Sequence, residues 1–166
     1  ANTDLPTVEG ITTTLVETAE EMAAVLELEF PHSDALIMSA AVADAKVANY
    51  SEAKIRKESL NRVDLAKNPD ILKSLSTNKK LNQIIIGFAA ETSEDLAMLE
   101  ENGRAKLASK SLDLIYVNNV TNGAVFGSNF TQGLIIDRDM NVIKVPEISK
   151  DTLSDILLDQ LVSKLG

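Results

Sequence analysis

Apolar residues in this chain gather in short blocks, and the residues between the blocks carry the signals of helices and turns. Residues 34–38, 84–88 and 114–117 are nearly all apolar, a pattern typical of strands buried on both faces of a parallel sheet. Residues 133–136 and 142–145, joined by a polar turn, predict a hairpin that closes the sheet. Three buried strands and a hairpin are therefore expected.

Helix-start signals fill the gaps between these blocks. Thr18 with Glu21 forms a capping-box pattern, and Pro69 stands where a first helical turn tolerates its missing N–H. A β-branched run at residues 11–17 predicts one more strand, so the chain would open as a strand–helix–strand unit. The predicted helices are residues 19–30, a helix starting at Asn68-Pro69-Asp70 and reaching about Ser76, one capped within residues 92–95 and reaching about Lys110, and one capped by Ser149 and reaching about Leu165.

The alternation of strands and helices predicts an α/β fold, a Rossmann-like three-layer domain with a mostly parallel sheet and a C-terminal hairpin. We interpret residues 1–166 as a single domain, with a less regular excursion at about 45–66 that projects as an arm. In such sheets ligands bind beyond the carboxyl ends of the strands. Candidate chemistry is therefore sought at those ends.

Composition narrows the functional classes. A formal net charge of -9 disfavours general binding to nucleic acid, and the absence of cysteine excludes disulfides, thiolate metal sites and a cysteine nucleophile. No apolar run approaches the roughly 20 residues that span a bilayer, and the first residues lack a signal-peptide pattern, so we expect a cytoplasmic protein. The chain opens at Ala1 on a polar, Pro-containing loop without Met, which suggests a processed or cut piece.

Two strand ends change from bulky apolar residues to small ones. They are Met38-Ser39-Ala40-Ala41-Val42-Ala43-Asp44 and Gly87-Phe88-Ala89-Ala90-Glu91-Thr92. Small side chains let a ligand approach the backbone, whose N–H and C=O groups can read a base or hold a phosphate. The same pattern also fits close packing between a strand and the following helix.

Clustered lysines offer a place for a highly charged anion. Lys54-Ile55-Arg56-Lys57, preceded by Lys46, stands out in an acidic chain, and Lys106 and Lys110 share one helical face at i, i+4. A nucleoside triphosphate needs such cations, or Mg²⁺, around its phosphates. A solvated arm and ordinary surface charge explain the same residues, and no P-loop or dinucleotide-binding glycine motif is present.

Taken in order, five blocks resemble phosphopantothenate-cysteine ligase, also called phosphopantothenoylcysteine synthetase, the C-terminal domain of the bacterial bifunctional coenzyme A biosynthesis protein. The blocks are residues 39–44, 54–57, 67–72, 87–92 and 106–115. The resemblance implies that 4'-phosphopantothenate attacks CTP to give an acyl-cytidylate and pyrophosphate, and that L-cysteine then displaces CMP. It implies Mg²⁺ with the nucleotide, and FMN only if the chain is fused to a flavin-dependent decarboxylase, which nothing here resembles.

The family's roles carry over onto matching residues of this chain. Backbone groups of the first strand end would face the nucleotide, Asp44 would hold the nucleotide or its metal, Lys54 would contact phosphate, and Phe88 would pack against the nucleotide. The arm would join two subunits into a homodimer, so that Lys54 serves a neighbour's site. The complete set of CTP-binding residues implied in this way is Met38, Ser39, Ala40, Asp44, Lys54, Pro69, Asp70, Ile71, Leu72, Phe88, Lys106 and Lys110.

This chain departs from the family at two places. The family begins with a further strand, a glycine-bearing loop and a stretch containing a catalytic asparagine, and the resemblance here starts after all of them. The main catalytic asparagine is therefore expected upstream of Ala1, no catalytic residue is assigned within the chain, and we expect residues 1–166 alone to be inactive or nearly so. Residues 117–120 and 126–131, around a Gly- and Asn-rich loop expected at 118–129, also lose several of the family's usual residues, which leaves the role of that loop open.

Two other functions fit parts of the sequence. A noncatalytic oligomerisation or regulatory module could retain a nucleotide pocket, and the missing catalytic part favours that alternative. An oxidoreductase of similar fold using NAD(P) is disfavoured by the absent glycine fingerprint and by the lysine cluster.

Overall fold

A mixed five-stranded sheet forms the centre of the protein. The computed structural model describes residues 6–51, 53–54, 56, 62–93, 95–120 and 127–166. Strands β1, β4 and β5 pair in parallel, β5 pairs antiparallel with β6, and β6 pairs antiparallel with β7, so four of these five strands run in one direction. The strands, in their spatial order, are β1 (Ala35–Met38), β4 (Ile84–Glu91), β5 (Leu114–Asn119), β6 (Phe130–Asp137) and β7 (Val142–Ser149).

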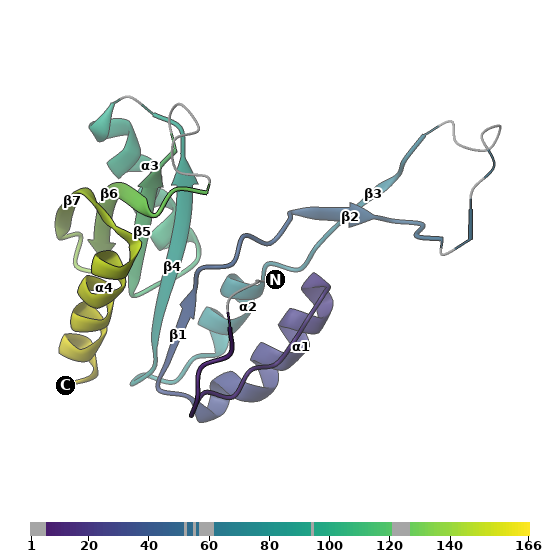
Figure 1. The fold of residues 1–166 in the computed structure, drawn as a ribbon, viewed down its shortest axis with the longest axis horizontal. Coiled ribbons are helices and arrows are strands. Elements are labelled where there is room, and N and C mark those ends of the chain that lie inside the picture. The colour runs from purple at the N-terminus through teal and green to yellow at the C-terminus, as the bar shows by residue number, and fades with distance from the viewer. Residues whose placement is uncertain (1–5, 52, 55, 57–61, 94, 121–126) are drawn as a thin grey trace.

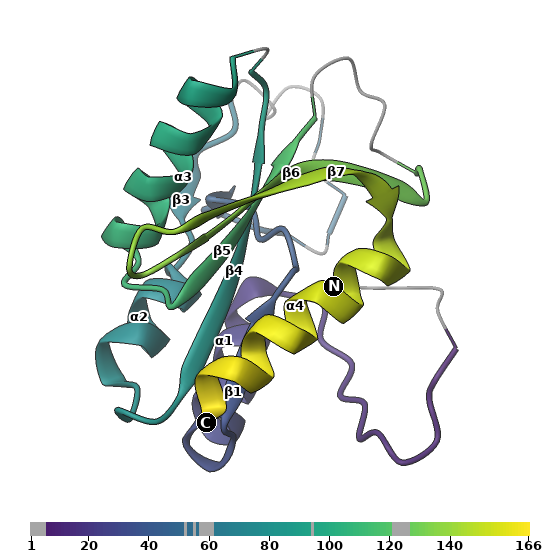
Figure 2. The same ribbon diagram turned by 90° about the vertical axis from the view of Figure 1, so that its left-hand side faces the viewer.

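Helices cover both faces of this sheet, which gives the expected three-layer α/β fold (Figure 1). Helices α1, α2 and α3 pack on one face and α4 packs on the other (Figures 1 and 2). Successive side chains of β4 point to opposite faces of the sheet. Ile85 packs in the core beneath α1, α2 and α3, and Ile86 packs in the core beneath α4. The helices are α1 (Ala19–Glu29), a short 3₁₀ turn (Phe30–His32), α2 (Ile71–Asn78), α3 (Leu96–Ser109) and α4 (Lys150–Leu165).

The helix starts follow the signals in the sequence. Thr18 Oγ1 accepts the backbone N–H of Glu21 at 3.1 Å, and the Glu21 carboxylate accepts the N–H of Thr18 at 3.3 Å, which completes the predicted capping box. Asp70, Asp95 and Ser149 cap the other three helices through their side chains. These boundaries confirm the predicted helices to within a few residues.

Two glycines allow elements to approach closely. A Cβ on Gly103 of α3 would lie 2.6 Å from Val117 Cγ2 and 2.7 Å from Ile136 Cδ1, so the helix rests directly on β5 and β6. A Cβ on Gly133 would collide with the carbonyl oxygen of Val117. Close packing therefore explains a glycine within α3 that helix propensity disfavours.

The predicted strand at residues 11–17 is wrong. This run has no strand conformation, and its apolar side chains Ile11 and Leu15 are 63% and 84% exposed. A strand needs a partner for its N–H and C=O groups, and none of the described strands pairs with this run. High β propensity alone could not form a strand here.

A two-stranded ribbon, β2 (Ala45–Val47) paired antiparallel with β3 (Leu65–Lys67), projects from the body of the molecule (Figure 1). It lies in the segment predicted as an arm, and the exposed apolar side chains Tyr50 and Val63, 80% and 59% exposed, lie on the connection between its two strands. Within the part of the chain that the structure describes, no helix combines the length and apolar character needed to cross a bilayer.

The hairpin turn between β6 and β7 is held by Asp137. Burial alone would raise the pKa of this carboxyl, but hydrogen bonds from the side chain and backbone of Asn141, the charge of Lys164 and the N–H of Asp139 together lower it. The folded pKa thus lies below the unfolded value of about 3.9. The resulting stabilisation is complete above the unfolded pKa and is lost as the pH falls through the folded pKa.

We therefore expect an Asp137→Asn variant to lose less stability than the wild type when the pH falls from 6 to 3. Urea unfolding across that range measures the difference. Asp139→Asn, an exposed change in the same turn, is the matched control and should follow the wild type. Parallel pH profiles for wild type and Asp137→Asn would contradict this role of Asp137.

Candidate functional site

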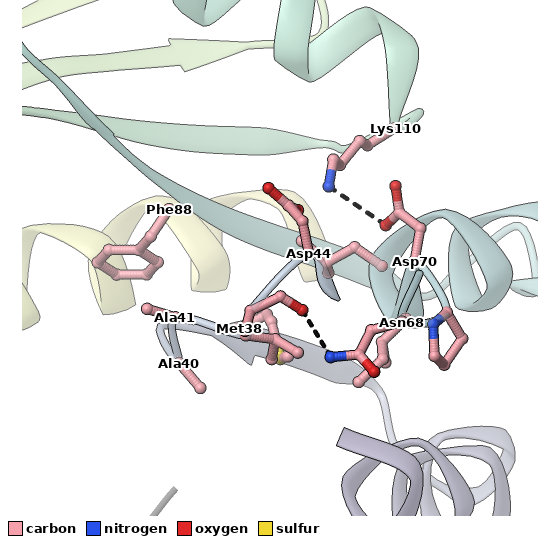
Figure 3. A pocket seen from close by; sticks show the side chains of 13 residues that line it. Met38, Ala40, Ala41, Asp44, Asn68, Asp70, Phe88 and Lys110 are labelled. Carbon is pink, nitrogen blue, oxygen red and sulfur yellow. Dashed lines mark hydrogen bonds and ion pairs between the residues drawn. The ribbon is translucent and has the colours of Figure 1, made fainter. Parts of the chain in front are cut away.

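A cavity of about 230 Å³ opens at the carboxyl ends of β1 and β4 (Figure 3). Four segments distant in the sequence build it: the end of β1 with the residues after it, the junction between β3 and α2, β4 at Phe88, and the C-terminal end of α3. Small side chains on the first segment leave backbone groups near the cavity. The lining residues are Met38, Ala40, Ala41, Val42, Ala43, Asp44, Asn68, Pro69, Asp70, Ile71, Leu72, Phe88 and Lys110.

Asn68 fastens the first segment to the second. Its side-chain Nδ2 donates to the carbonyl of Ala43 at 2.8 Å (Figure 3), and its backbone N–H donates to the carbonyl of Asp44 at 2.9 Å. Asn68 Oδ1 is buried and has no hydrogen-bond partner among the described residues. These two bonds hold Asp44 at the cavity where the arm begins.

The N-terminus of α2 faces the same cavity. Asp70 Oδ1 accepts the N–H of Lys73 at 3.2 Å as a helix cap, and Lys110 Nζ donates to the same oxygen at 3.2 Å. Both side chains of the Asp70–Lys110 pair are about 40% exposed, and such pairs stabilise a protein by only about 0–1 kcal/mol. Because this ion pair is weak, an anionic ligand could replace Asp70 as the partner of Lys110 with little loss of stability. The N-terminus of α2 lies beside it and also attracts negative charge.

Phe88 provides the flat apolar wall of the cavity. Its ring stands edge-on to Tyr116, with centroids 5.8 Å apart and an interplanar angle of 71°. Tyr116 is fixed from below by a 2.7 Å hydrogen bond with Thr131, and burial raises the pKa of its phenol. A supported aromatic face can stack on a planar base.

The structure brings together nine of the twelve residues that the family resemblance implies. Three lie elsewhere. Ser39 lines a neighbouring cavity of about 390 Å³ that shares the Phe88 wall on the α4 side. The nine that line the first cavity are Met38, Ala40, Asp44, Pro69, Asp70, Ile71, Leu72, Phe88 and Lys110.

The other two are lysines that do not reach the cavity in this structure. Lys106 pairs with Glu91, whose second oxygen accepts from Asn102 at 3.2 Å. Lys54 is exposed on the connection between β2 and β3, in the arm. Both lysines therefore need a change of position or a second subunit before they can contact a ligand in the cavity.

Several predicted features lie outside the described residues. They include Ile55 and Lys57 beside Lys54, and residues 121–126 of the loop expected at 118–129. Ala1 and the four residues after it also lie outside them. The catalytic asparagine expected upstream of Ala1 therefore stays a prediction, and none of the cavity residues takes its place as an assigned catalytic group.

Sequence reasoning gave no role to Asn68, although it stands in the Asn68-Pro69-Asp70 helix start. The signal was its polar side chain directly before a proline, because the residue before proline is extended and cannot join the helix. The amide is thus free to bond across to another segment. Ala41, Val42 and Ala43 likewise line the cavity through their place on the extended segment after β1.

The chain is similar to known proteins in sequence and in fold. The family model of the DNA/pantothenate metabolism flavoprotein C-terminal domain matches residues 1–165. Proteins named "Coenzyme A biosynthesis bifunctional protein CoaBC" are 34% identical over 152 residues in Borreliella burgdorferi and 35% identical over 150 residues in Bacillus subtilis. These alignments include 90% and 89% of this chain but only 37% and 36% of those proteins.

A solved structure, the C-terminal domain of a coenzyme A biosynthesis bifunctional protein CoaBC, superposes with a TM-score of 0.77 at 28% identity. The match covers 96% of this chain and 69% of that one. The predicted fold class and the predicted family resemblance are both confirmed.

Proposed function

Because the chain belongs to the DNA/pantothenate metabolism flavoprotein C-terminal domain family, we propose that it joins 4'-phosphopantothenate to L-cysteine, with CTP, in coenzyme A biosynthesis. The match to proteins named for coenzyme A biosynthesis supports the pathway. The chain spans less than two-fifths of the length of those relatives, so the proposal concerns the ligase part of such a protein. We propose a cytoplasmic location for this reaction.

The chemistry proceeds in two steps. A carboxylate oxygen of 4'-phosphopantothenate attacks the α-phosphorus of CTP, and the bond to the bridging oxygen breaks to release pyrophosphate. The amine of cysteine then attacks the acyl carbon of the acyl-cytidylate, loses a proton, and expels CMP as the amide forms. Neither step needs a nucleophile from the protein, so positioning and charge neutralisation carry the catalysis.

Residues of the cavity suit those tasks. Phe88 supplies a face for the base, and the backbone after β1 supplies N–H and C=O groups for its edge. Lys110 and the N-terminus of α2 offer positive charge for phosphate oxygens. If Lys106 breaks its ion pair with Glu91, it could also contact the phosphates, because Lys106 and Lys110 lie on the same side of α3.

A magnesium ion carried by the nucleotide fits the carboxylates at the cavity. Mg²⁺ commonly takes one or two protein carboxylates and completes its shell with phosphate oxygens and water. Asp44 and Asp70 both line the cavity, and the described residues hold no cluster of three or more metal-binding side chains that would form an independent metal centre. The ion would neutralise phosphate charge while Asp44 and Asp70 hold it in place.

The arm supplies the remaining lysine in this proposal. Lys54 does not line the cavity of its own subunit; it lies on the connection between β2 and β3. The ribbon that these two strands form projects from the body (Figure 1). In a homodimer joined through the arms, Lys54 would reach the phosphates in the neighbour's cavity. Exposed apolar side chains on the same connection, including Tyr50 and Val63, support such a contact.

The observation that carries the proposal is the convergence of nine family-implied residues on one cavity at the strand ends. Pyrophosphate release tests it. The natural polypeptide that contains residues 1–166 should release pyrophosphate with CTP, Mg²⁺ and 4'-phosphopantothenate, and should form the amide when cysteine is added. Residues 1–166 alone should turn over at least 100-fold more slowly, because the solved relative contains a part with no counterpart here.

Nucleotide binding without pyrophosphate release by the natural polypeptide would instead indicate a noncatalytic module. Equal turnover by residues 1–166 alone would contradict the expectation that the catalytic asparagine lies upstream of Ala1.

A further inference from the structure

Asn68 stands where the arm joins the body of the molecule, directly after β3 and directly before Pro69. The residue before a proline is restricted to extended conformations, so Asn68 continues the line of β3. Its backbone N–H donates to the carbonyl of Asp44 at 2.9 Å, one residue beyond the last paired residues of the ribbon, Ala45 and Lys67. The backbone bonding of the arm therefore ends at the cavity, between Asp44 and Asn68.

The side chain of Asn68 adds a second bond to the same short segment. Nδ2 donates to the carbonyl of Ala43 at 2.8 Å (Figure 3). The opposite orientation of the amide would bring Oδ1 against this carbonyl oxygen, and two acceptors repel each other, so the Ala43 carbonyl fixes which way the amide points. One residue thus binds two successive carbonyls, those of Ala43 and Asp44.

These two bonds hold the peptide groups on either side of the Asp44 Cα. The carbonyl of Ala43 belongs to the planar group that ends at the nitrogen of Asp44, and the carbonyl of Asp44 belongs to the next planar group. Rotation about φ or ψ of Asp44 would turn one group relative to the other and break a bond to Asn68. Asn68 therefore restricts both torsion angles of Asp44, and with them the direction in which its side chain leaves the backbone.

The carboxylate of Asp44 has no comparable support of its own. It forms no hydrogen bond or ion pair with any residue that the structure describes, it is exposed, and it lines the cavity. Its position is therefore set through the backbone, and the backbone at this point is held by Asn68.

The amide of Asn68 contributes little to the stability of the fold. Its Oδ1 is buried and has no hydrogen-bond partner within the described part of the chain. Burying an acceptor without a partner costs free energy, and this cost offsets the gain from the Nδ2 bond. A buried polar atom left unpaired calls for an explanation other than stability, and the placement of Asp44 provides one.

We infer that Asn68 is a positioning residue of the nucleotide site, and that it acts through Asp44. The inference rests on the proposed function, in which Asp44 holds CTP or its Mg²⁺. A carboxylate that is already directed to the cavity does not have to be ordered when the ligand binds, and this preorganisation strengthens binding.

Calorimetric titration of the natural polypeptide that contains residues 1–166, with CTP and Mg²⁺, tests this role. Asn68→Ala should raise the Kd for CTP by roughly 10-fold, because Asp44 is no longer preorganised, and should leave the Tm nearly unchanged. In an Asp44→Ala background the same substitution should change the Kd by less than about 2-fold, because the carboxylate that Asn68 positions is gone. This dependence on Asp44 separates positioning from a general effect on the fold.

Two further variants complete the experiment. Asn68→Asp keeps the shape of the side chain but loses the Nδ2 donor, so it should weaken CTP binding at least as much as alanine does. Asn78→Ala is the matched control. The Nδ2 of Asn78 also donates to a backbone carbonyl, that of Ser74 at 3.2 Å, but Asn78 lies on α2 and does not line the cavity, so this variant should bind CTP like the wild type.

An Asn68→Ala effect of equal size with and without Asp44 would overturn the inference, since Asn68 would then not act through that carboxylate. Binding of CTP at wild-type strength by Asn68→Ala or Asn68→Asp would overturn it as well. The wild type still binds CTP in each of these results, so the proposed function would stand. Absence of CTP binding by the wild type would contradict the proposed function and this inference together.

Discussion

Replacing Asp113 with alanine is expected to lower the free energy of unfolding by about 3–5 kcal/mol. The side chain is 1% exposed, and its Oδ2 accepts the backbone N–H of Ile85 at 2.7 Å. Lys79 pairs with the same oxygen, and Arg138 lies in ion-pair contact with Oδ1 although no hydrogen bond forms there. Removing this carboxylate leaves the Ile85 N–H without its acceptor and the largely buried Lys79 ammonium, which also donates to the carbonyl of Gln83, without its counter-charge.

Urea unfolding at neutral pH measures this effect. Asp155→Ala, an exposed change on α4, is the control and should shift the free energy by less than about 0.5 kcal/mol. Asp113→Asn keeps an acceptor for Ile85 but not the charge, so it should fall between alanine and wild type. A cost below about 1 kcal/mol for Asp113→Ala would show that the cluster does not stabilise the fold.

Replacing Lys110 with alanine is expected to weaken CTP binding by roughly 10–100-fold, the effect of losing one charge-assisted hydrogen bond to phosphate. Its pair with Asp70 is exposed and weak, so the fold should be unaffected. Binding should also weaken as salt is raised, and the difference between wild type and variant should shrink.

Calorimetric titration with CTP and Mg²⁺ checks this expectation, and Lys144→Ala is the matched control. Lys144 is an exposed lysine on β7 that does not line the cavity. If both variants bind CTP like the wild type, Lys110 does not contact the ligand.

The fold could be predicted largely from local pattern. The blocks at 84–88 and 114–117 became strands because all-apolar runs in an α/β chain have only the sheet interior to occupy. Thr18, Asp70 and Ser149 cap helices because their side chains accept the N–H groups that a helix start leaves free. Both signals act within a few residues, so the sequence reveals them.

Interactions between distant segments were harder to predict. Residues 11–17 have the composition of a strand, but pairing depends on a neighbour that no local pattern specifies. The bond from Asn68 to Ala43 joins segments 25 residues apart, and the pairing of Lys106 with Glu91 depends on how α3 lies on the sheet. The i, i+4 spacing predicts that Lys106 and Lys110 share one helical face, but it does not predict that Lys106 pairs with Glu91.

Calorimetry of the unmodified protein with CTP, ATP and NADP, each with Mg²⁺, tests the central claim most directly. The site at the ends of β1 and β4 is proposed to hold CTP, so CTP should bind at least about 10-fold more tightly than ATP or NADP, a difference of about 1.4 kcal/mol. Equal binding of the three nucleotides, or no binding of CTP, would contradict the proposed function.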